Sequence, residues 1–268
     1  MIEKRVRLGD LETWYAEHGA GDPVVLVHPG GADARAWGPN LAPIAERFRV
    51  YTPERRGHGR TPDVEGPMTY ALMVQDTVAF LEAVVGGPAH MVGCSAGAIV
   101  ALMTAVARPD LVRRLALVSG VHHRDGWHPE AIDPDIPPHP VLRRGYEELS
   151  PDGAEHYPVV QRKLARLNFE EPTMQPEDLS RVASRTLVMV GDDDEVSLEH
   201  AIATYRAIPD AELAVVPGTS HGLLYEKTDL CNQILLDFLV NDPVQTIAPV
   251  RRRRDAVEQA NHHPTPQP

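Results

Sequence analysis

The sequence predicts an α/β fold, a doubly wound and mostly parallel sheet of about eight strands, with one helical insertion. Short apolar runs, typical of strands buried on both faces, alternate about six times with segments of helical length and spacing. This alternation is interrupted once, between residues 121 and 182, by a proline-rich stretch with no strand–helix repeat. A length of 268 residues suits one such domain carrying an inserted element.

The first part of the core is expected over residues 1–120. Its elements are expected in this order: strands over 5–8, 11–17 and 24–27, a helix over 37–48, a strand over 49–52 and a helix over 70–85. The first two strands alternate in polarity and are joined by a Gly9-Asp10 turn, which predicts a hairpin. The third is a continuous apolar run, which predicts a buried parallel strand.

Residues 90–100, HMVGCSAGAIV, predict a buried strand, a tight turn and an Ala-rich helix. Gly93 and Gly97 bracket Ser95 in the pattern G-x-S-x-G. In so sharp a turn the central residue takes a positive φ, and its hydroxyl stands out of the fold near the positive end of the helix. The alternative is a glycine-rich turn whose small residues only permit close packing.

The insertion is expected over residues 121–182, with two helical stretches between proline-rich links. The second part of the core, residues 183–240, continues with elements in this order: a strand over 186–190, a helix over 198–208, a strand over 212–216 and a helix over 229–239. Residues 241–268 have the composition of a disordered tail. Its four arginines, Arg251–Arg254, are expected to be solvated, with an interaction patch as the alternative.

Composition excludes several classes of protein. A formal net charge of −12 argues against a nucleic-acid-binding surface, and no apolar run is long enough to span a membrane. The N-terminus lacks the apolar segment of a secretory signal, and two cysteines provide no disulfide framework, so a cytoplasmic location is expected. No Cys/His spacing indicates zinc, and we expect neither a metal nor a cofactor. The expected partner is a small-molecule substrate, and a homodimer is one assembly that the sequence allows.

Polar residues of chemical interest cluster at predicted strand ends. Ser95, the loop 28–31, the run 192–194 and His221 each follow a predicted strand. Because the carboxyl ends of parallel strands meet at one edge of a sheet, these residues are expected to lie together. A serine becomes a nucleophile when a histidine, oriented by a carboxylate, takes its proton.

Five motifs together resemble the α/β-hydrolase family over residues 3–240. They are HPGG at 28–31, RGHGRT at 56–61, GCSAG at 93–97, GDDD at 191–194 and SHG at 220–222. The resemblance implies that Ser95 is the nucleophile, His221 the general base and Asp194 the orienting acid. Asp192 and Asp193 are expected to be turn or cap residues. The family's other position for the acid follows the strand ending at 118, where this chain has Ser119-Gly120 and no carboxylate.

The same resemblance implies that the backbone N–H groups of Gly30 and Ala96 stabilise the oxyanion. Pro29 replaces the glycine usual beside the loop histidine, but it leaves the donor at Gly30 intact. Cys94 flanks the nucleophile position, so its side chain is expected to point into the sheet. Three further motif residues are expected to be mainly structural: His28, Arg56 and His58. The alternatives are a direct catalytic role for His28 and a substrate contact for Arg56 and His58.

The insertion resembles the family's helical cap, which roofs the pocket and selects the substrate. Its large side chains are expected either to line an apolar cavity or only to hold the cap together: Trp127, Tyr146, Tyr157, Leu164, Leu167 and Phe169. The expected function is a cofactor-free serine hydrolase that cleaves a small or medium-sized, largely apolar carboxylic ester. The alternatives are a C–C bond hydrolase, a lactonase or a perhydrolase on the same residues, and a ligand-binding protein without catalysis.

Overall fold

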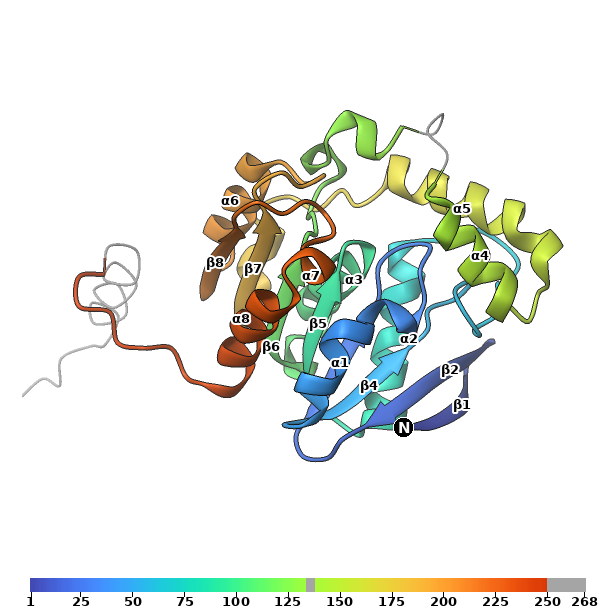
Figure 1. Ribbon diagram of the computed structural model, residues 1–268, viewed down its shortest axis with the longest axis horizontal. Helices are drawn as coiled ribbons and strands as arrows, with labels where there is room; N and C mark the ends of the chain where they lie inside the picture. Colours follow the sequence, from blue (N-terminus) through green and yellow to red (C-terminus); the bar gives the residue numbers. More distant parts are fainter. Residues whose placement is uncertain (134–137, 250–268) are drawn as a thin grey trace, which may run out of the picture.

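In the computed structural model, residues 1–133 and 138–249 are described, and they contain an eight-stranded sheet (Figure 1). Its order is β1-β2-β4-β3-β5-β6-β7-β8, in which β2 pairs antiparallel with β1 and β4 and all other pairs are parallel. The strands are β1 (Ile2–Leu8), β2 (Leu11–His18), β3 (Pro23–Val27), β4 (Arg49–Pro53), β5 (Ala89–Cys94), β6 (Val112–Val118), β7 (Arg185–Gly191) and β8 (Ala211–Val216). The predicted fold class is confirmed.

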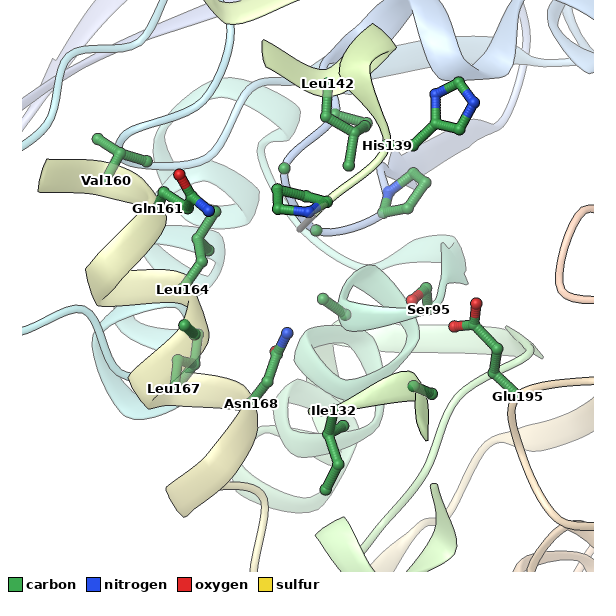
Figure 2. A pocket seen from close by; sticks show the side chains of 18 of the residues that line it. Ser95, Ile132, His139, Leu142, Val160, Gln161, Leu164, Leu167, Asn168 and Glu195 are labelled. Carbon is green, nitrogen blue, oxygen red and sulfur yellow. The ribbon is translucent and has the colours of Figure 1, made fainter. Parts of the chain in front are cut away.

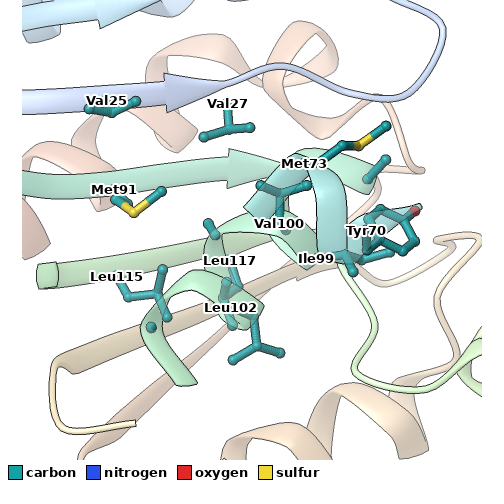
Figure 3. Packing of buried hydrophobic residues seen from close by; sticks show 14 of the residues in the cluster. Val25, Val27, Tyr70, Met73, Met91, Ile99, Val100, Leu102, Leu115 and Leu117 are labelled. Atoms are coloured by element: carbon teal, nitrogen blue, oxygen red, sulfur yellow. The ribbon is translucent and has the colours of Figure 1, made fainter. Parts of the chain in front are cut away.

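Helices cover both faces of this sheet. They are α1 (Gly38–Ala45), α2 (Tyr70–Phe80), α3 (Ala96–Ala107), α4 (Pro140–Leu149), α5 (Tyr157–Glu170), α6 (Leu198–Ala207), α7 (Leu223–Glu226) and α8 (Thr228–Val240). Successive side chains of a strand point to opposite faces. Val24 and Leu26 of β3 therefore belong to the cluster that includes α1 and α8. Val25 and Val27 belong to the cluster on the other face, and Figure 3 shows them with side chains of α2 and α3.

Some element boundaries differ from those expected. The helix predicted over 70–85 is α-helical only to Phe80 and ends in a wider π turn over Leu81–Val85, closed by the Gly86 N–H on the Leu81 carbonyl. The helix predicted over 37–48 begins as a 3₁₀ turn at Ala34 and ends at Ala45. These differences arise at helix ends, where local hydrogen bonding competes with side-chain periodicity.

The segment between β6 and β7 places α4 and α5 over the carboxyl ends of the parallel strands (Figure 1). The Lys163 ammonium of α5 lies 2.7 Å from Asp63, and Arg35 lies 2.8 Å from Glu148 of α4, so ion pairs tie both helices to loops of the core. Residues 241–249 form no helix or strand, and Arg251–Arg254 lie outside the described residues. No helix within residues 1–133 and 138–249 combines the length and apolarity needed to cross a bilayer.

Candidate active site

Three side chains from three strand ends meet at the carboxyl edge of the sheet. Ser95 follows β5, Asp194 follows β7 and His221 follows β8. The Ser95 Oγ lies 3.0 Å from Nε2 of His221, and Nδ1 of His221 lies 2.7 Å from Oδ1 of Asp194. The structure therefore brings together the three residues singled out in the sequence, although more than a hundred positions separate the first from the last.

Ser95 stands in the strained backbone conformation that its glycine neighbours suggest. Its φ is +55°, and the helix α3 begins at the next residue. A Cβ at Gly93 would lie 2.3 Å from the Gly97 carbonyl oxygen, and one at Gly97 would lie 2.0 Å from the Val27 carbonyl oxygen. Only glycine fits at either position, so the tight turn that exposes the serine hydroxyl depends on both.

Asp194 accepts hydrogen bonds on both carboxylate oxygens. Besides His221, the backbone N–H of Val196 donates to Oδ1 at 3.2 Å, while the Gly191 N–H and the Ser119 hydroxyl donate to Oδ2 at 3.0 and 2.6 Å. Burial alone would raise the pKa of Asp194, but its hydrogen bonds, led by the one with His221, lower the pKa below its ordinary value. The group is a carboxylate at neutral pH.

Ser119 is a hydrogen-bond donor to Asp194 that was not predicted from the sequence. It follows β6, has a φ of +50° and is buried. The sequence has no carboxylate after β6, but the Ser119 hydroxyl at that strand end binds the Asp194 carboxylate of the loop after β7. The signal available in the sequence was its place, directly after a predicted parallel strand.

Asp192 and Asp193 join the two loops that carry the site, and within residues 1–133 and 138–249 neither forms a hydrogen bond with His221. The Asp192 carboxylate accepts the Thr219 N–H at 3.0 Å, and the Asp193 N–H donates to the Thr219 carbonyl at 3.0 Å. Their contacts are those of turn residues. They hold the loop after β8 at a set distance from the loop after β7.

His221 is surrounded by groups that favour its protonated form. Burial lowers the pKa of His221, but the hydrogen bond to Asp194 and the charge of Glu195 outweigh it, so the net pKa lies above the ordinary value of 6.5. The Glu195 carboxylate is 3.7 Å from Nε2, and the Trp127 ring meets the imidazole edge to face at 5.7 Å. The contact of Glu195 with His221 was not predicted from the sequence, because it depends on the direction in which the Glu195 side chain leaves its loop.

Gly30 and Ala96 lie side by side next to Ser95. A Cβ at Gly30 would contact the Ala96 Cβ at 3.3 Å. Within residues 1–133 and 138–249 neither backbone N–H has an acceptor, and both residues line the pocket described below. Two amides in this setting can bind a developing negative charge. Cys94, in contrast, is buried under the site, and burial raises the pKa of its thiol to about 12.

A cavity of about 490 Å³ opens above Ser95. Helix α5 forms one wall, Leu142 of α4 lies above, and Ser95 faces them from the opposite side (Figure 2). Of the six large side chains expected either to line the cavity or to hold the cap together, five line it: Trp127, Tyr146, Tyr157, Leu164 and Leu167. Tyr146, Tyr157 and Leu167 also belong to the hydrophobic core, so they both line the cavity and hold the cap together.

Phe169 does not line the cavity, so the first of the two roles expected for it is wrong. This side chain is 56% exposed. It lies near the end of α5 on the outer side, where the Arg124 guanidinium covers its ring at 5.5 Å. In the described ranges, no group of three His, Cys, Asp or Glu side chains is arranged to hold a metal ion.

Two motif residues of the RGHG turn, Arg56 and His58, have hydrogen-bond partners within the core. The Arg56 guanidinium binds both oxygens of Asp76 on α2, at 2.7 and 2.8 Å. His58 is buried, and its Nδ1–H donates to the Arg56 carbonyl at 2.9 Å. Burial lowers the pKa of His58 to about 3. Neither side chain lines the cavity.

Comparison with known proteins decides the family. Residues 24–234 match the family described as "Alpha/beta hydrolase family". The chain belongs to the alpha/beta hydrolase family. The relatives of this alpha/beta hydrolase named below carry the names of hydrolases, and its eight-stranded sheet is the fold expected from the motifs.

Two relatives align with most of the alpha/beta hydrolase described here. RutD of Azorhizobium caulinodans, named for carbamate hydrolysis, is 28% identical over 254 residues, which cover 86% of this chain and 96% of RutD. The 2-hydroxy-6-oxo-6-(2'-aminophenyl)hexa-2,4-dienoic acid hydrolase of Metapseudomonas resinovorans is 29% identical, over 89% of this chain and 91% of its own. Among solved structures, the meta-cleavage product hydrolase CumD of Pseudomonas fluorescens superposes with a TM-score of 0.76 at 23% identity, covering 88% of this chain and 97% of CumD.

Proposed function

We propose that this protein is a serine hydrolase that cleaves a small or medium-sized, largely apolar carboxylic ester through an acyl-enzyme. One observation carries the proposal. The Ser95 hydroxyl, the His221 imidazole and the Asp194 carboxylate form a continuous hydrogen-bonded series, with contacts of 3.0 and 2.7 Å, at the floor of an apolar cavity. Such a series activates a serine hydroxyl at neutral pH.

In the first half of the reaction, Oγ of Ser95 attacks the ester carbonyl carbon while Nε2 of His221 takes the hydroxyl proton. Because a carboxylate only accepts hydrogen bonds, Asp194 holds the proton of the neutral ring on Nδ1 and leaves Nε2 free to act as the base. The carbonyl oxygen becomes an oxyanion, which the N–H groups of Gly30 and Ala96 bind. The imidazolium then returns its proton to the departing alcohol, and the acyl group remains on Ser95.

In the second half, water attacks the acyl carbon and gives one proton to Nε2 of His221. The tetrahedral intermediate collapses, Oγ of Ser95 recovers the proton, and the carboxylic acid leaves. Asp194 remains a carboxylate throughout, since its hydrogen bonds keep its pKa low. The carboxylate stabilises the imidazolium in both halves of the cycle.

The cavity supports a neutral, apolar substrate. Leucine, valine and aromatic side chains of the insertion line much of it, and the polar lining includes Gln161, Asn168 and the oppositely charged Glu195 and Arg55. The Glu195 carboxylate lies 3.7 Å from Nε2 of His221, so it would repel a negative charge carried by the substrate near the leaving group. A volume of about 490 Å³ suits a small or medium-sized molecule.

A C–C bond hydrolase is the second candidate, because the Metapseudomonas resinovorans relative is named for a dienoic acid. The same serine, base and amides would serve a vinylogous diketone. A lactonase or a perhydrolase would also use these residues. Glu195 and Arg55, of opposite charge, both line the cavity, so the substrate panel below separates this candidate from the ester.

The test of catalysis is covalent labelling with a fluorophosphonate. We expect one equivalent to label wild-type protein at Ser95, and no labelling of Ser95→Ala with an unchanged melting temperature. Absence of labelling in folded wild-type protein would favour a binding protein without catalysis. The attachment site is identified by peptide mass spectrometry.

A substrate panel separates the candidate reactions. It contains p-nitrophenyl esters of graded chain length, a ring-cleavage diketone and a lactone. We expect the highest kcat/KM among the esters. Preference for the diketone or the lactone by more than tenfold would replace the ester with that substrate class.

The proposal includes a small-molecule partner and a cytoplasmic location. Both Cys94 and Cys231 are free and buried, as suits a reducing compartment. Fractionation of the source cells, with the protein detected by antibody, tests the location. Recovery outside the cytoplasm would refute it.

A further inference from the structure

Arg55, which follows β4, is a buried cation with no carboxylate partner. Its residue exposure is 6%, and within residues 1–133 and 138–249 it forms no ion pair. Burial lowers the pKa of the guanidinium to about 10, so it remains charged at neutral pH. A buried charge without a counter-charge is costly and is kept where it serves a site.

The guanidinium is directed at two backbone carbonyl groups of the loop after β3. Nη2 donates to the His28 carbonyl at 2.7 Å and to the Pro29 carbonyl at 2.9 Å. The remaining donors have poor partners, since Nη1 meets only the Met73 sulfur at 3.6 Å and Nε has none. The strong contacts of this cation are therefore both with the loop that contains Gly30.

The Pro29 carbonyl and the Gly30 N–H belong to the same peptide group. A trans peptide is planar, and its C=O and N–H point in opposite directions. Fixing the carbonyl therefore fixes the direction of the N–H. With the carbonyl turned toward Arg55, the Gly30 N–H points in the opposite direction, away from Arg55, and Gly30 lies against Ala96.

The neighbouring histidine reinforces the same orientation. Nε2 of His28 accepts the backbone N–H of Arg55 at 3.1 Å, so the neutral ring carries its proton on Nδ1. Nδ1 lies 2.8 Å from the Pro29 carbonyl and donates to it. Burial and the nearby Arg55 charge lower the pKa of His28 well below its ordinary value, which keeps the ring neutral. The Pro29 carbonyl thus accepts from two side chains, Arg55 and His28, at 2.9 and 2.8 Å, and more distantly from the Ala32 backbone N–H at 3.4 Å.

We propose that Arg55 is a positioning residue that holds the Pro29–Gly30 peptide with its N–H aimed at the oxyanion. The inference rests on the proposed serine hydrolase function. Arg55 acts in two ways. Its hydrogen bonds prevent the peptide from turning its carbonyl toward the reacting oxygen, and its positive charge polarises the peptide, which strengthens the N–H as a donor.

The test compares Arg55→Met with Arg56→Met. Arg56 is equally buried, but it binds Asp76 and does not line the cavity. Hydrolysis of p-nitrophenyl butyrate is measured per active site, with sites counted by end-point titration with a fluorophosphonate. We expect kcat/KM of Arg55→Met to fall about 10²- to 10³-fold, as on loss of one oxyanion donor, and Arg56→Met to lose thermal stability with kcat/KM per site within threefold of wild type.

Affinity for a transition-state analogue separates positioning from a merely structural role. Inhibition by 1-butaneboronic acid should weaken in Arg55→Met by a factor close to the loss in kcat/KM. Arg55→Lys, which keeps the charge and can donate to the Pro29 carbonyl, should recover part of both. A kcat/KM per site within threefold of wild type in Arg55→Met, or unchanged boronate affinity beside a large loss of activity, would overturn the inference.

A crystal structure of wild-type protein with the boronate on Ser95 tests the geometry whether or not the variants fold. The Gly30 nitrogen should lie about 2.7–3.1 Å from a boronate oxygen, with Arg55 on the Pro29 carbonyl. A peptide turned with its carbonyl toward the boronate would overturn the inference. Failure of the proposed function is distinct, because fluorophosphonate would then label no serine in the wild type.

Discussion

Replacing Asp194 with asparagine should remove most catalysis while leaving the fold in place. The carboxylate receives backbone N–H groups on both oxygens, from Val196 on Oδ1 and from Gly191 on Oδ2. An asparagine has one carbonyl oxygen, so its NH₂ group must face one of those N–H groups. The substitution therefore forces a choice between two orientations.

The contacts favour the unproductive orientation. The amide oxygen is better placed at Oδ2, where it accepts the Gly191 N–H at 3.0 Å and the Ser119 hydroxyl at 2.6 Å, than at Oδ1 with the longer Val196 contact of 3.2 Å. The NH₂ group then donates to Nδ1 of His221. That places the ring proton on Nε2, where it blocks transfer from Ser95.

We expect kcat of Asp194→Asn to fall on the order of 10⁴-fold, as for the same change in a related catalytic triad, which corresponds to about 5 kcal/mol. The assay is steady-state hydrolysis of p-nitrophenyl butyrate, with a thermal melt to confirm folding. Asp192→Asn is the matched control, since Asp192 contacts only the neighbouring loop, and it should keep kcat within about tenfold. A folded Asp194→Asn with kcat within tenfold of wild type, or a larger loss in Asp192→Asn, would refute the reasoning.

Three further outcomes are expected. Activity requires neutral His221, whose pKa is raised, so kcat/KM should fall as pH decreases through a midpoint above 6.5; Glu195→Gln should move that midpoint down, and an unmoved midpoint would exclude the influence of Glu195. Gly97→Ala would place a Cβ 2.0 Å from the Val27 carbonyl oxygen, so the free energy of unfolding in urea should drop by about 3 kcal/mol or more; a loss under about 1 kcal/mol would contradict the close approach. Leu164→Trp narrows the cavity, so kcat/KM for an octanoate ester should fall about tenfold relative to the acetate ester, whereas an equal loss for both would remove Leu164 from the acyl pocket.

Most of the fold could be predicted because its signals are local. Buried parallel strands are continuous apolar runs in the sequence. The turn around Ser95 needs glycine at 93 and 97, because any side chain there would clash with a backbone carbonyl group. Helix ends were less predictable, as at the π turn after Phe80, because competing hydrogen bonds of similar energy decide them. Phe169 was misplaced because helical periodicity does not say which side of α5 faces the cavity.

The sequence by itself determined the order of the elements and the three chemical groups at the ends of β5, β7 and β8. Tertiary structure decided what surrounds them. Ser119 on the carboxylate, Glu195 beside the imidazole and Arg55 on the Pro29 carbonyl each act through a contact of a few ångströms between separate loops. Hydrogen bonds and charges depend on direction and distance, and these exist only once the strands have set their carboxyl ends side by side.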